Sequence, residues 1–347
     1  MQTILSRLQK EPSPLIEGNT AIFVWQGKSA PLLQGDFTDW ERGEPVTLEK
    51  DGPDLWVYQT EFPEDAYIEY IFQDGEQRIR DPLNPRRTPN GTGNDNNFFY
   101  MPKAARTPLS DYRKGVPRGR VTRYRIPTWR LVVGNYRMVY LYQPPTIQPC
   151  PLVVVWDGRD YLHRGRLAHI VDNLIHQKRI QPIALAMVDN GGKARMAEYG
   201  CSESTLIFLL EAILPLAQTE LNLLDLSAHE GSYAVLGASM GGLMALYTAL
   251  RLPTIFGSVL SQSGAFSFGE HESVLFEIIK KFDLRSLKIW MDIGIYDFKY
   301  LLEANRHMHP LLVDGGYAVA YREYPGGHNY PSWRDEVWRG LEHLFGK

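Results

Sequence analysis

The chain has few cysteines and no long apolar run, and each shortage excludes a class of protein. Its 347 residues include only Cys150 and Cys201, whose spacing matches no metal motif. Two isolated thiols favour a reducing compartment over a disulfide-stabilised secreted fold. No apolar stretch approaches the roughly 20 residues needed to span a bilayer, and the N-terminus lacks the pattern of a secretory signal. We therefore predict a cytoplasmic protein that does not bind a membrane.

The distribution of charge gives no sign of a large charged partner. The formal net charge is -3, from 37 basic and 40 acidic residues, and no run of lysine or arginine stands out. This pattern predicts no nucleic-acid partner. We find no metal-ligand cluster and no phosphate-binding loop, so we predict no metal and no cofactor. A small-molecule substrate is the partner that remains, and the sequence leaves open whether the chain forms a homo-oligomer.

Residues 1–105 have the pattern of short strands separated by turns. Leu55 to Phe62 and Ala66 to Gln73 alternate aromatic or apolar residues with polar ones, as strands with one buried face do. Asp74-Gly75 follows the second segment and is a strong signal for a tight hairpin. We predict a small all-β sandwich over residues 1–105, followed by a proline-rich linker to about residue 117.

From residue 118 to 347, solid apolar runs alternate with helix-like stretches, which indicates an α/β fold with a mostly parallel sheet and helices on both faces. The first two strands should be antiparallel. The predicted strands are Val121–Ile126, Arg137–Tyr142, Leu152–Trp156, Ile183–Val188, Tyr233–Leu236, Ser258–Leu260, Ile289–Ile293 and Ala318–Tyr321. The predicted helices are Arg166–His176, Ser204–Gln218, Gly241–Leu250, Glu272–Phe282, Asn305–Asp314 and Trp333–Phe345.

The segment from Gly237 to Gly241 fits the Gly-x-Ser-x-Gly pattern, with Ser239 at its centre. In this pattern a strand turns at once into a helix and leaves the serine at the tip. Small residues two positions before and after the serine keep strand and helix from colliding. A plain glycine-rich turn is the alternative. Because a predicted strand precedes the motif and a predicted helix follows it, we predict that Ser239 is the nucleophile of an α/β-hydrolase that cleaves esters.

An activated serine needs a histidine base and a carboxylate that orients it, and this fold places them in the order serine, acid, histidine. Five histidines follow Ser239. His328 lies in a turn between the last predicted strand and the last predicted helix, where the fold carries its base. His307 and His309 lie in a helical stretch, where a solvated surface role fits better. The pattern favours His328 as the base, with a surface loop histidine as the alternative.

Three carboxylates compete for the role of the acid. Asp297 stands just beyond the predicted strand end at Ile293, and Gly294 would let the chain turn there. Asp292 lies inside the apolar run, and Glu303 is a weaker third choice. The sequence favours Asp297, but a strand that ended earlier would exchange the roles of Asp297 and Asp292.

The oxyanion of an ester's tetrahedral intermediate needs preorganised N–H donors. One is predicted to be the backbone of Met240, the residue after the nucleophile. The other is predicted to be the backbone of Arg159, in the loop Trp156-Asp157-Gly158-Arg159 after the third strand. The alternative is that Asp157-Gly158 is simply a turn.

Several of these segments together resemble the enterochelin esterase branch of the esterase D superfamily. The matching segments are Gly237–Leu246, Phe256–Gly264, Trp156-Asp157-Gly158, Arg195-x-x-Glu198-Tyr199, and the Gly-Gly-His328 turn followed by Trp333. The resemblance covers about residues 118–345. It implies a triad of Ser239, Asp297 and His328, with the backbones of Arg159 and Met240 as the oxyanion hole.

The same resemblance implies substrate-facing roles for Arg164 and Trp333, although a solvated charge is the alternative for Arg164. Arg195 and Glu198 could form a structural ion pair instead of binding substrate. One departure from the branch is Ala265-Phe266-Ser267-Phe268, because enterochelin esterases carry a pair of tryptophans there.

The N-terminal segment is similar to early-set domains of the glycogen-binding type. Gly35-Asp36-Phe37-x-x-Trp40 carries this resemblance, as does Asp74-Gly75 followed by Asp81-Pro82. Such modules stack exposed aromatic rings on sugars. The candidates here are Trp25, Trp40 and Trp56, and their strand spacing favours core positions.

The resemblance therefore implies a serine ester hydrolase that acts through an acyl-enzyme on a small-molecule ester, without a cofactor. Relatives include siderophore esterases, feruloyl and acetyl xylan esterases, and acyltransferases. The alternatives are a feruloyl or acetyl esterase, or an acyltransferase acting on carbohydrate-linked esters. A different class of function, a catalytically silent carbohydrate-binding protein, is disfavoured by the intact serine, aspartate and histidine.

Overall fold

The computed structural model describes residues 4–269, 271–281 and 287–347. The chain forms two compact units. Unit 1 comprises Met1–Ala105 together with two later segments, Gly294–Lys299 and Glu323–Asn329. Unit 2 comprises Arg106–Ile293, Tyr300–Arg322 and Tyr330–Lys347. The division after Ala105 coincides with the predicted end of the sandwich, whereas the sequence did not predict that the two later segments belong to unit 1.

Unit 1 contains two antiparallel sheets within residues 4–105. One has the strand order β1-β2-β6-β5, and the other has the order β4-β3-β7-β10-β9 with β8 paired to β7. Their bounds are β1 (Leu15–Glu17), β2 (Thr20–Gln26), β3 (Leu32–Gly35), β4 (Val46–Thr47), β5 (Glu49–Gly52), β6 (Leu55–Glu61), β7 (Tyr67–Asp74), β8 (Gln77–Ile79), β9 (Arg87–Pro89) and β10 (Asp95–Tyr100). Helix α1 (Ile4–Leu8) precedes them. At the predicted hairpin, Asp74 pairs with Gln77, and Gly75 has a φ of 56°, which glycine adopts without strain.

An aromatic core fills unit 1. The Phe23 ring lies 4.9 Å from the Tyr70 ring and 5.7 Å from the Phe99 ring, both in edge-on geometry. Trp25 and Trp56 pack against this core and donate their indole N–H groups to backbone carbonyls. Both tryptophans are half-buried, so their placement matches the core role that the strand spacing favoured over a sugar-stacking platform.

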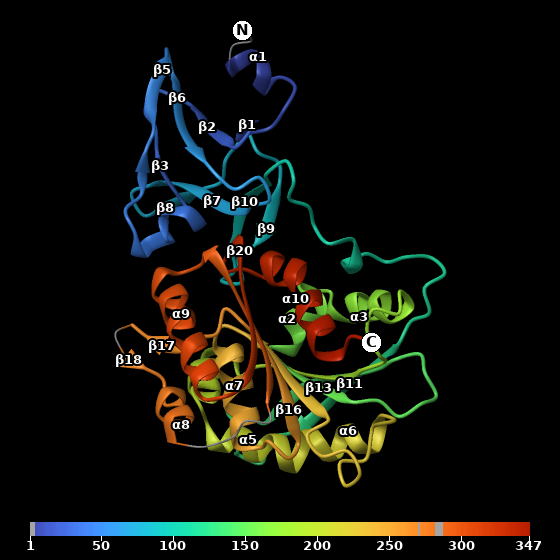
Figure 1. Ribbon diagram of the computed structural model, residues 1–347. Coiled ribbons are helices and arrows are strands. Elements are labelled where there is room, and N and C mark those ends of the chain that lie inside the picture. The colour runs from blue at the N-terminus through green and yellow to red at the C-terminus, as the bar shows by residue number, and fades with distance from the viewer. Residues whose placement is uncertain (1–3, 270, 282–286) are drawn as a thin grey trace. The chain divides into compact units, whose positions relative to one another are not determined.

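Unit 2 contains most of a mixed sheet with the order β11-β12-β14-β13-β15-β16-β19-β20 in the described chain (Figure 1). The pairs β11·β12 and β12·β14 are antiparallel, and the pairs from β14 through β13, β15 and β16 to β19 are parallel. The strand bounds are β11 (Arg120–Pro127), β12 (Tyr136–Gln143), β13 (Leu152–Trp156), β14 (Ala184–Val188), β15 (Tyr233–Ala238), β16 (Phe256–Gln262), β19 (Lys288–Tyr296) and β20 (Ala318–Gly327). Every residue of β13 and β14 is buried, as strands covered on both faces require.

Helices cover both faces of this sheet. One hydrophobic core joins α2, α3 and α10 to one face, and α7 packs on β15 and β16 from the other (Figure 1). The helices are α2 (Gly158–His163), α3 (Leu167–His176), α4 (Arg195–Tyr199), α5 (Glu203–Phe208), α6 (Leu214–Glu220), α7 (Met240–Arg251), α8 (Leu275–Lys281), α9 (Lys299–Asp314) and α10 (Tyr330–Phe345). Within the described residues no single helix has the length and apolar composition to cross a bilayer. The bent pair Gly192–Tyr199 and Glu203–Glu220 reaches that length and composition only when its two helices are taken together. The architecture is the predicted mostly parallel sheet with helices on both faces.

The ends of several elements differ from the prediction. Strand β19 runs on to Tyr296 instead of ending at Ile293, and β20 runs on to Gly327. Helix α8 begins at Leu275, because Glu272 belongs to a short strand, β18 (His271–Glu272), paired with β17 (Ser267–Phe268). The predicted helix end at Phe282 lies outside the described residues.

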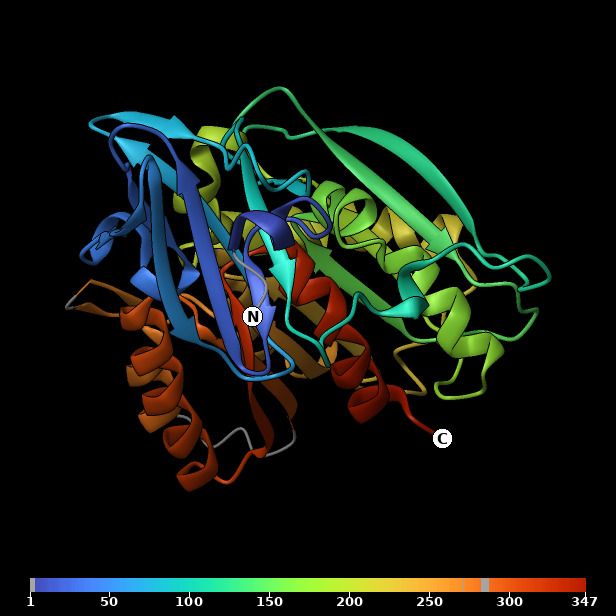
Figure 2. The same cartoon turned by 90° about the horizontal axis from the view of Figure 1, so that it is seen from above.

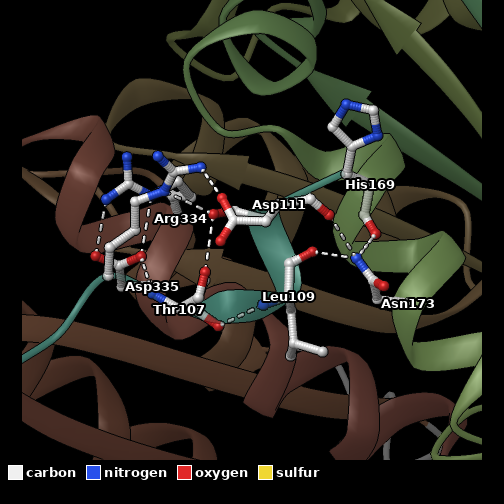
Figure 3. Close-up of polar contacts among 9 residues, drawn as sticks. Thr107, Leu109, Asp111, His169, Asn173, Arg334 and Asp335 are labelled. Atoms are coloured by element: carbon white, nitrogen blue, oxygen red, sulfur yellow. Dashed lines mark hydrogen bonds and ion pairs between the residues drawn. The ribbon is translucent and has the colours of Figure 1, made fainter. Parts of the chain in front are cut away.

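The linker after Ala105 is tied to two helices of unit 2. The Thr107 N–H donates to Asp335 of α10 over 2.9 Å, and the side-chain amide of Asn173 in α3 donates to the Leu109 and Asp111 carbonyls over 2.7 and 3.0 Å (Figure 3). In Figure 2 this teal segment passes beside the red helix α10. The linker is therefore an ordered connection on the surface of unit 2.

Candidate active site

Ser239 stands on a sharp turn between β15 and α7. Its backbone has φ 57° and ψ -124°, a conformation that residues other than glycine rarely adopt and that costs free energy. A Cβ atom on Gly237 would lie 2.2 Å from the carbonyl oxygen of Gly241, so the turn requires glycine at that position. The segment has the geometry of the predicted nucleophile elbow.

Main-chain hydrogen bonds hold this elbow. The Ser239 N–H donates to the Gln262 carbonyl over 2.9 Å. The Ser239 carbonyl accepts from the N–H groups of Leu243 and Ala265, each over 3.0 Å. Since these three bonds use backbone atoms alone, the turn does not depend on the Ser239 hydroxyl.

His328 and Asp297 meet inside unit 1. The Nδ1 atom of His328 lies 2.8 Å from Oδ1 of Asp297. The Asp297 side chain is fully buried, whereas the imidazole of His328 is 14% exposed. The Phe298 ring stacks on the imidazole with centroids 4.6 Å apart. An acceptor at Nδ1 favours the tautomer with its lone pair on Nε2, which is the form that a general base needs.

Asp292, the other candidate for the catalytic acid, binds different residues. Its side chain is fully buried within β19. The carboxylate accepts the indole N–H of Trp290 over 2.8 Å, and the side-chain amide of Gln262 lies 3.3 Å from both of its oxygens. The hydrogen bond to His328 is therefore formed by Asp297, and the role of Asp297 as the acid stays a prediction.

The role expected for Gly294 was wrong. The chain does not turn there, because β19 continues to Tyr296. A Cβ atom on Gly294 would instead lie 2.0 Å from the carbonyl oxygen of Gly326. Glycine is needed at this position because the two chain segments approach closely, and Asp297 follows directly after the longer strand.

We expect Asp292→Asn to change stability and to leave turnover nearly normal. Burial raises the pKa of Asp292 to about 7, which against an ordinary value of about 3.9 corresponds to about 4 kcal/mol. Because the pKa is higher in the folded state, protonated Asp292 stabilises the fold below about pH 4, and this contribution is lost as the pH rises through about 7. Asparagine stays neutral, so the variant should gain on the wild type by up to about 4 kcal/mol between pH 4 and pH 8.

Urea unfolding of both proteins across this pH range measures the difference. Parallel curves of unfolding free energy against pH would contradict the expectation.

The loop after β13 has the shape expected of the second oxyanion-hole segment. Asp157 has a φ of 58°, and a Cβ atom on Gly158 would lie 2.2 Å from the main chain of β14. Arg159 is exposed in the first turn of α2, where backbone N–H groups lack intrahelical acceptors. Met240 occupies the first turn of α7 in the same way. Their roles as oxyanion donors stay predictions.

Arg195, singled out in the sequence, binds this loop. Its Nε and Nη2 atoms donate to the two carboxylate oxygens of Asp157 over 2.7 and 2.6 Å. Asn190 donates to the same carboxylate over 2.6 Å. The Nη2 atom of Arg195 also donates to the carbonyl of Ala238 over 3.2 Å. A bidentate hydrogen bond fixes the orientation of both the guanidinium and the carboxylate. Arg195 therefore connects the loop after β13 to the end of β15.

The suggested ion pair between Arg195 and Glu198 was therefore wrong. Glu198 pairs with Arg137, whose two terminal nitrogens lie 2.8 and 3.0 Å from its oxygens, and both side chains are about 5% exposed. Glu198 also accepts the backbone N–H of Val133 over 2.9 Å. Sequence spacing could not show these partners, since each lies far away along the chain.

We expect Arg195→Ala to lower kcat by about 10- to 100-fold, because the loop that carries Arg159 would lose its attachment to the elbow. It should also destabilise the protein by about 3 kcal/mol, since the Asp157 carboxylate stays buried with fewer partners. Arg195→Lys should retain more stability and still lose turnover, because an ammonium group cannot form the two-pronged bond.

Ester hydrolysis rates and urea unfolding test both variants. Arg179→Ala, which removes the surface partner of Glu342, is the control. An unchanged kcat in Arg195→Ala would refute the role.

The two substrate-contact candidates have different surroundings. Arg164 lies 3.3 Å from the carboxylate of Asp160, and its guanidinium lies 4.4 Å from the centre of the Tyr330 ring. Trp333 is only 5% exposed and donates its indole N–H to the hydroxyl of Ser263 over 2.9 Å. This burial favours a packing role for Trp333. Substrate contact stays a prediction for both residues.

Comparison with known proteins identifies the family. The model of the Esterase family matches residues 132–344, more than half of the chain. The iron(III) enterobactin esterase of Escherichia coli K12 is 27% identical over 283 residues, which cover 78% of this chain and 68% of that protein. The enzyme of the same name from Dickeya dadantii is 25% identical over 366 residues, covering 88% and 81%.

Solved structures show the same fold. The enterobactin esterase of Shigella flexneri, crystallised in the presence of enterobactin, matches with a TM-score of 0.80 at 23% identity, over 99% of this chain and 98% of that one. A ferulic acid esterase matches with a TM-score of 0.54 at 16% identity, over 66% and 98%. The chain therefore belongs to the Esterase family and is a carboxylic ester hydrolase with an α/β-hydrolase fold.

Proposed function

We propose that Ser239, His328 and Asp297 act together as a catalytic triad that hydrolyses esters through an acyl-enzyme. The observation that carries this proposal is the strained elbow at Ser239, since such a backbone persists where function needs it. The 2.8 Å bond between Asp297 and His328 supports it by supplying an oriented base. His328 takes the hydroxyl proton as Ser239 attacks the ester carbonyl, and returns this proton to the leaving alcohol. It then activates the water that releases the acid.

The backbone N–H groups of Arg159 and Met240 are the proposed donors to the oxyanion. Both lie in the first turn of a helix, where N–H groups are available and the helix dipole favours negative charge. The bond between Arg195 and Ala238 supports the assignment, because it joins the segments that carry the two donors. No metal or cofactor is part of this scheme.

As substrate we propose a siderophore ester of the iron(III) enterobactin type. The names of the Escherichia coli and Dickeya relatives support this class. Shigella structures determined with enterobactin and with 2,3-dihydroxy-N-benzoyl-serine support it as well. In the segment Ala265–Phe268, which replaces the tryptophan pair of enterochelin esterases, Phe266 is fully buried and Phe268 is 41% exposed. We also propose a cytoplasmic location, in keeping with the free thiols of Cys150 and Cys201.

Hydrolysis of a panel of esters tests the proposal. Iron(III) enterobactin should be hydrolysed with a higher kcat/KM than p-nitrophenyl acetate or a feruloyl ester, and a fluorophosphonate probe should label the protein once. Turnover of the simple esters without turnover of enterobactin would overturn the substrate and leave the triad standing. Absence of both hydrolysis and labelling would overturn the whole proposal. Product analysis with an added alcohol separates hydrolysis from acyl transfer.

A further inference from the structure

The turn motif Gly35-Asp36-Phe37-x-x-Trp40 of the N-terminal sandwich has no part in the chemistry described above. It nevertheless packs in unit 1 with the segments that carry Asp297 and His328. In unit 1, Gly294–Lys299 and Glu323–Asn329 pack with residues 1–105. The motif leaves β3 and forms two short 3-10 helices, Asp36–Thr38 and Trp40–Arg42. We call residues 35–42 the clasp, because its side chains contact both of the later segments.

Asp36 contacts both neighbours of His328. A Cβ atom on Gly327 would lie 2.2 to 2.5 Å from three carboxyl atoms of Asp36, which are its nearest neighbours. On the other side of the histidine, the side-chain amide of Asn329 lies 3.4 Å from an Asp36 oxygen. The backbone just before His328 therefore lies directly on this carboxylate, and only glycine fits there.

The sandwich holds Asp36 firmly in this position. Asp36 is 3% exposed. It accepts the backbone N–H of Glu69 over 2.8 Å and the indole N–H of Trp40 over 3.0 Å. Burial and the nearby Glu69 carboxylate raise the pKa of Asp36 well above its ordinary range. Burying a carboxyl group is costly, and here its hydrogen bonds connect the clasp both to Glu69 of the sandwich and to Asn329 beside His328.

The clasp also contacts the segment after Asp297. Oδ1 of Asp39 accepts the backbone N–H of Lys299 over 3.3 Å. The guanidinium of Arg42 lies 3.9 Å from the centre of the Phe298 ring, which itself stacks on the imidazole of His328. Thus the residues that follow the acid are fixed by the same short turn that fixes the residues around the base.

The backbone of the clasp is strained where these contacts originate. Asp39 and Trp40 are consecutive, and their φ angles are 60° and 54°. Two adjacent non-glycine residues with positive φ cost free energy that the surrounding structure must offset. At the start of the clasp, a Cβ atom on Gly35 would lie 2.5 Å from the Glu69 carbonyl oxygen. The turn is therefore held in one shape, as a rigid support must be.

We propose that the clasp is a positioning device for the catalytic base. Asp36 sets the backbone on either side of His328, while Asp39 and Arg42 set the segment that follows Asp297. This inference rests on the proposed function, since it has meaning only if His328 is the base. It makes the N-terminal sandwich a support of the active site instead of an independent sugar-binding module.

Kinetics of Asp36 variants test the proposal, with Asp81→Asn as a matched control. Asp81 is a second aspartate of the sandwich that is 3% exposed, and it bonds to the Tyr70 hydroxyl and the Leu83 N–H over 2.7 and 2.8 Å. Asp36→Ala should lower kcat on a p-nitrophenyl ester by about 100-fold with KM nearly unchanged, because a displaced base slows chemistry and not binding. Asp36→Asn should lose less, since its amide keeps the shape and one acceptor. Asp81→Asn should lower thermal stability and keep the kcat of the folded enzyme.

Arg42→Gln provides a second variant that should fold even if Asp36→Ala does not, since Arg42 is exposed. It should lower kcat several-fold at constant KM. Wild-type kcat in the folded clasp variants, with Ser239→Ala inactive, would overturn the clasp and leave the triad intact. Equal losses of kcat in Asp36→Ala and Asp81→Asn would also overturn it, because the effect would then be general. Retained turnover in Ser239→Ala would instead defeat the proposed function itself.

Discussion

Replacement of Ser239 by alanine should reduce ester hydrolysis to roughly 10³-fold above the uncatalysed rate, the level that binding and an oxyanion hole alone provide. Without the hydroxyl no acyl-enzyme can form, so the fluorophosphonate probe should fail to label the protein. The fold should persist, because the elbow is held by the main-chain bonds of Ser239 to Gln262, Leu243 and Ala265. Turnover of a p-nitrophenyl ester and the thermal unfolding midpoint measure the two effects.

Ser261→Ala is the matched control for this variant. Ser261 lies in β16, where it pairs with Gly237, and its side chain is fully buried. The substitution makes the same chemical change one strand away and should keep turnover within a few-fold of the wild type. Near-normal turnover in Ser239→Ala would mean that another residue is the nucleophile.

Asp297→Asn should lower kcat by up to about 10⁴-fold while the protein stays folded. The Asp297 carboxylate accepts from Nδ1 of His328 over 2.8 Å and from the Phe298 N–H over 2.7 Å. An amide can turn its N–H toward the imidazole, which favours the tautomer that has its proton on Nε2 and cannot act as the base. The rate of fluorophosphonate labelling should fall as well, because the attack of Ser239 depends on that base.

Asp292→Asn separates this effect from the general loss of a buried charge. Asp292 lies in the middle of β19 and Asp297 directly follows this strand, and both are at most 3% exposed. Only Asp297 contacts His328, so only Asp297→Asn should lose turnover, while Asp292→Asn should change the pH dependence of stability. Loss of activity in Asp292→Asn with a nearly active Asp297→Asn would reverse the assignment.

The elbow and the alternation of strands and helices could be predicted because their signals are local. Strand β15, the serine and helix α7 are contiguous in the sequence, and Gly237 is required by the turn itself. Asp297 was favoured because it lies beyond an apolar strand. It contacts His328 although the predicted strand end was three residues short, Gly294 to Tyr296.

Contacts between distant residues gave no such signal. Arg195 binds Asp157, 38 positions away, and Glu198 binds Arg137, 61 positions away. A single sequence cannot show which of many charged residues meet, because helix and strand periods fix only the face on which each side chain lies. The contact of Asp36 with the His328 turn was missed for the same reason, although the motif that contains Asp36 had been noticed for its likeness to sugar-binding modules.

The separation of unit 1 into three segments has a consequence for the order of synthesis. Asp36 and Asn329 are 293 positions apart, so at about 5–20 residues per second the ribosome needs roughly 15–60 s to bring the second out after the first. In the last part of that interval the nascent chain already carries the Ser239 turn but neither the finished turn around His328 nor its contact with Asp36. The chain therefore becomes able to cleave esters only after the segment that carries His328 and Asn329 has left the ribosome, and a truncated product that stops before residue 323 should be inert.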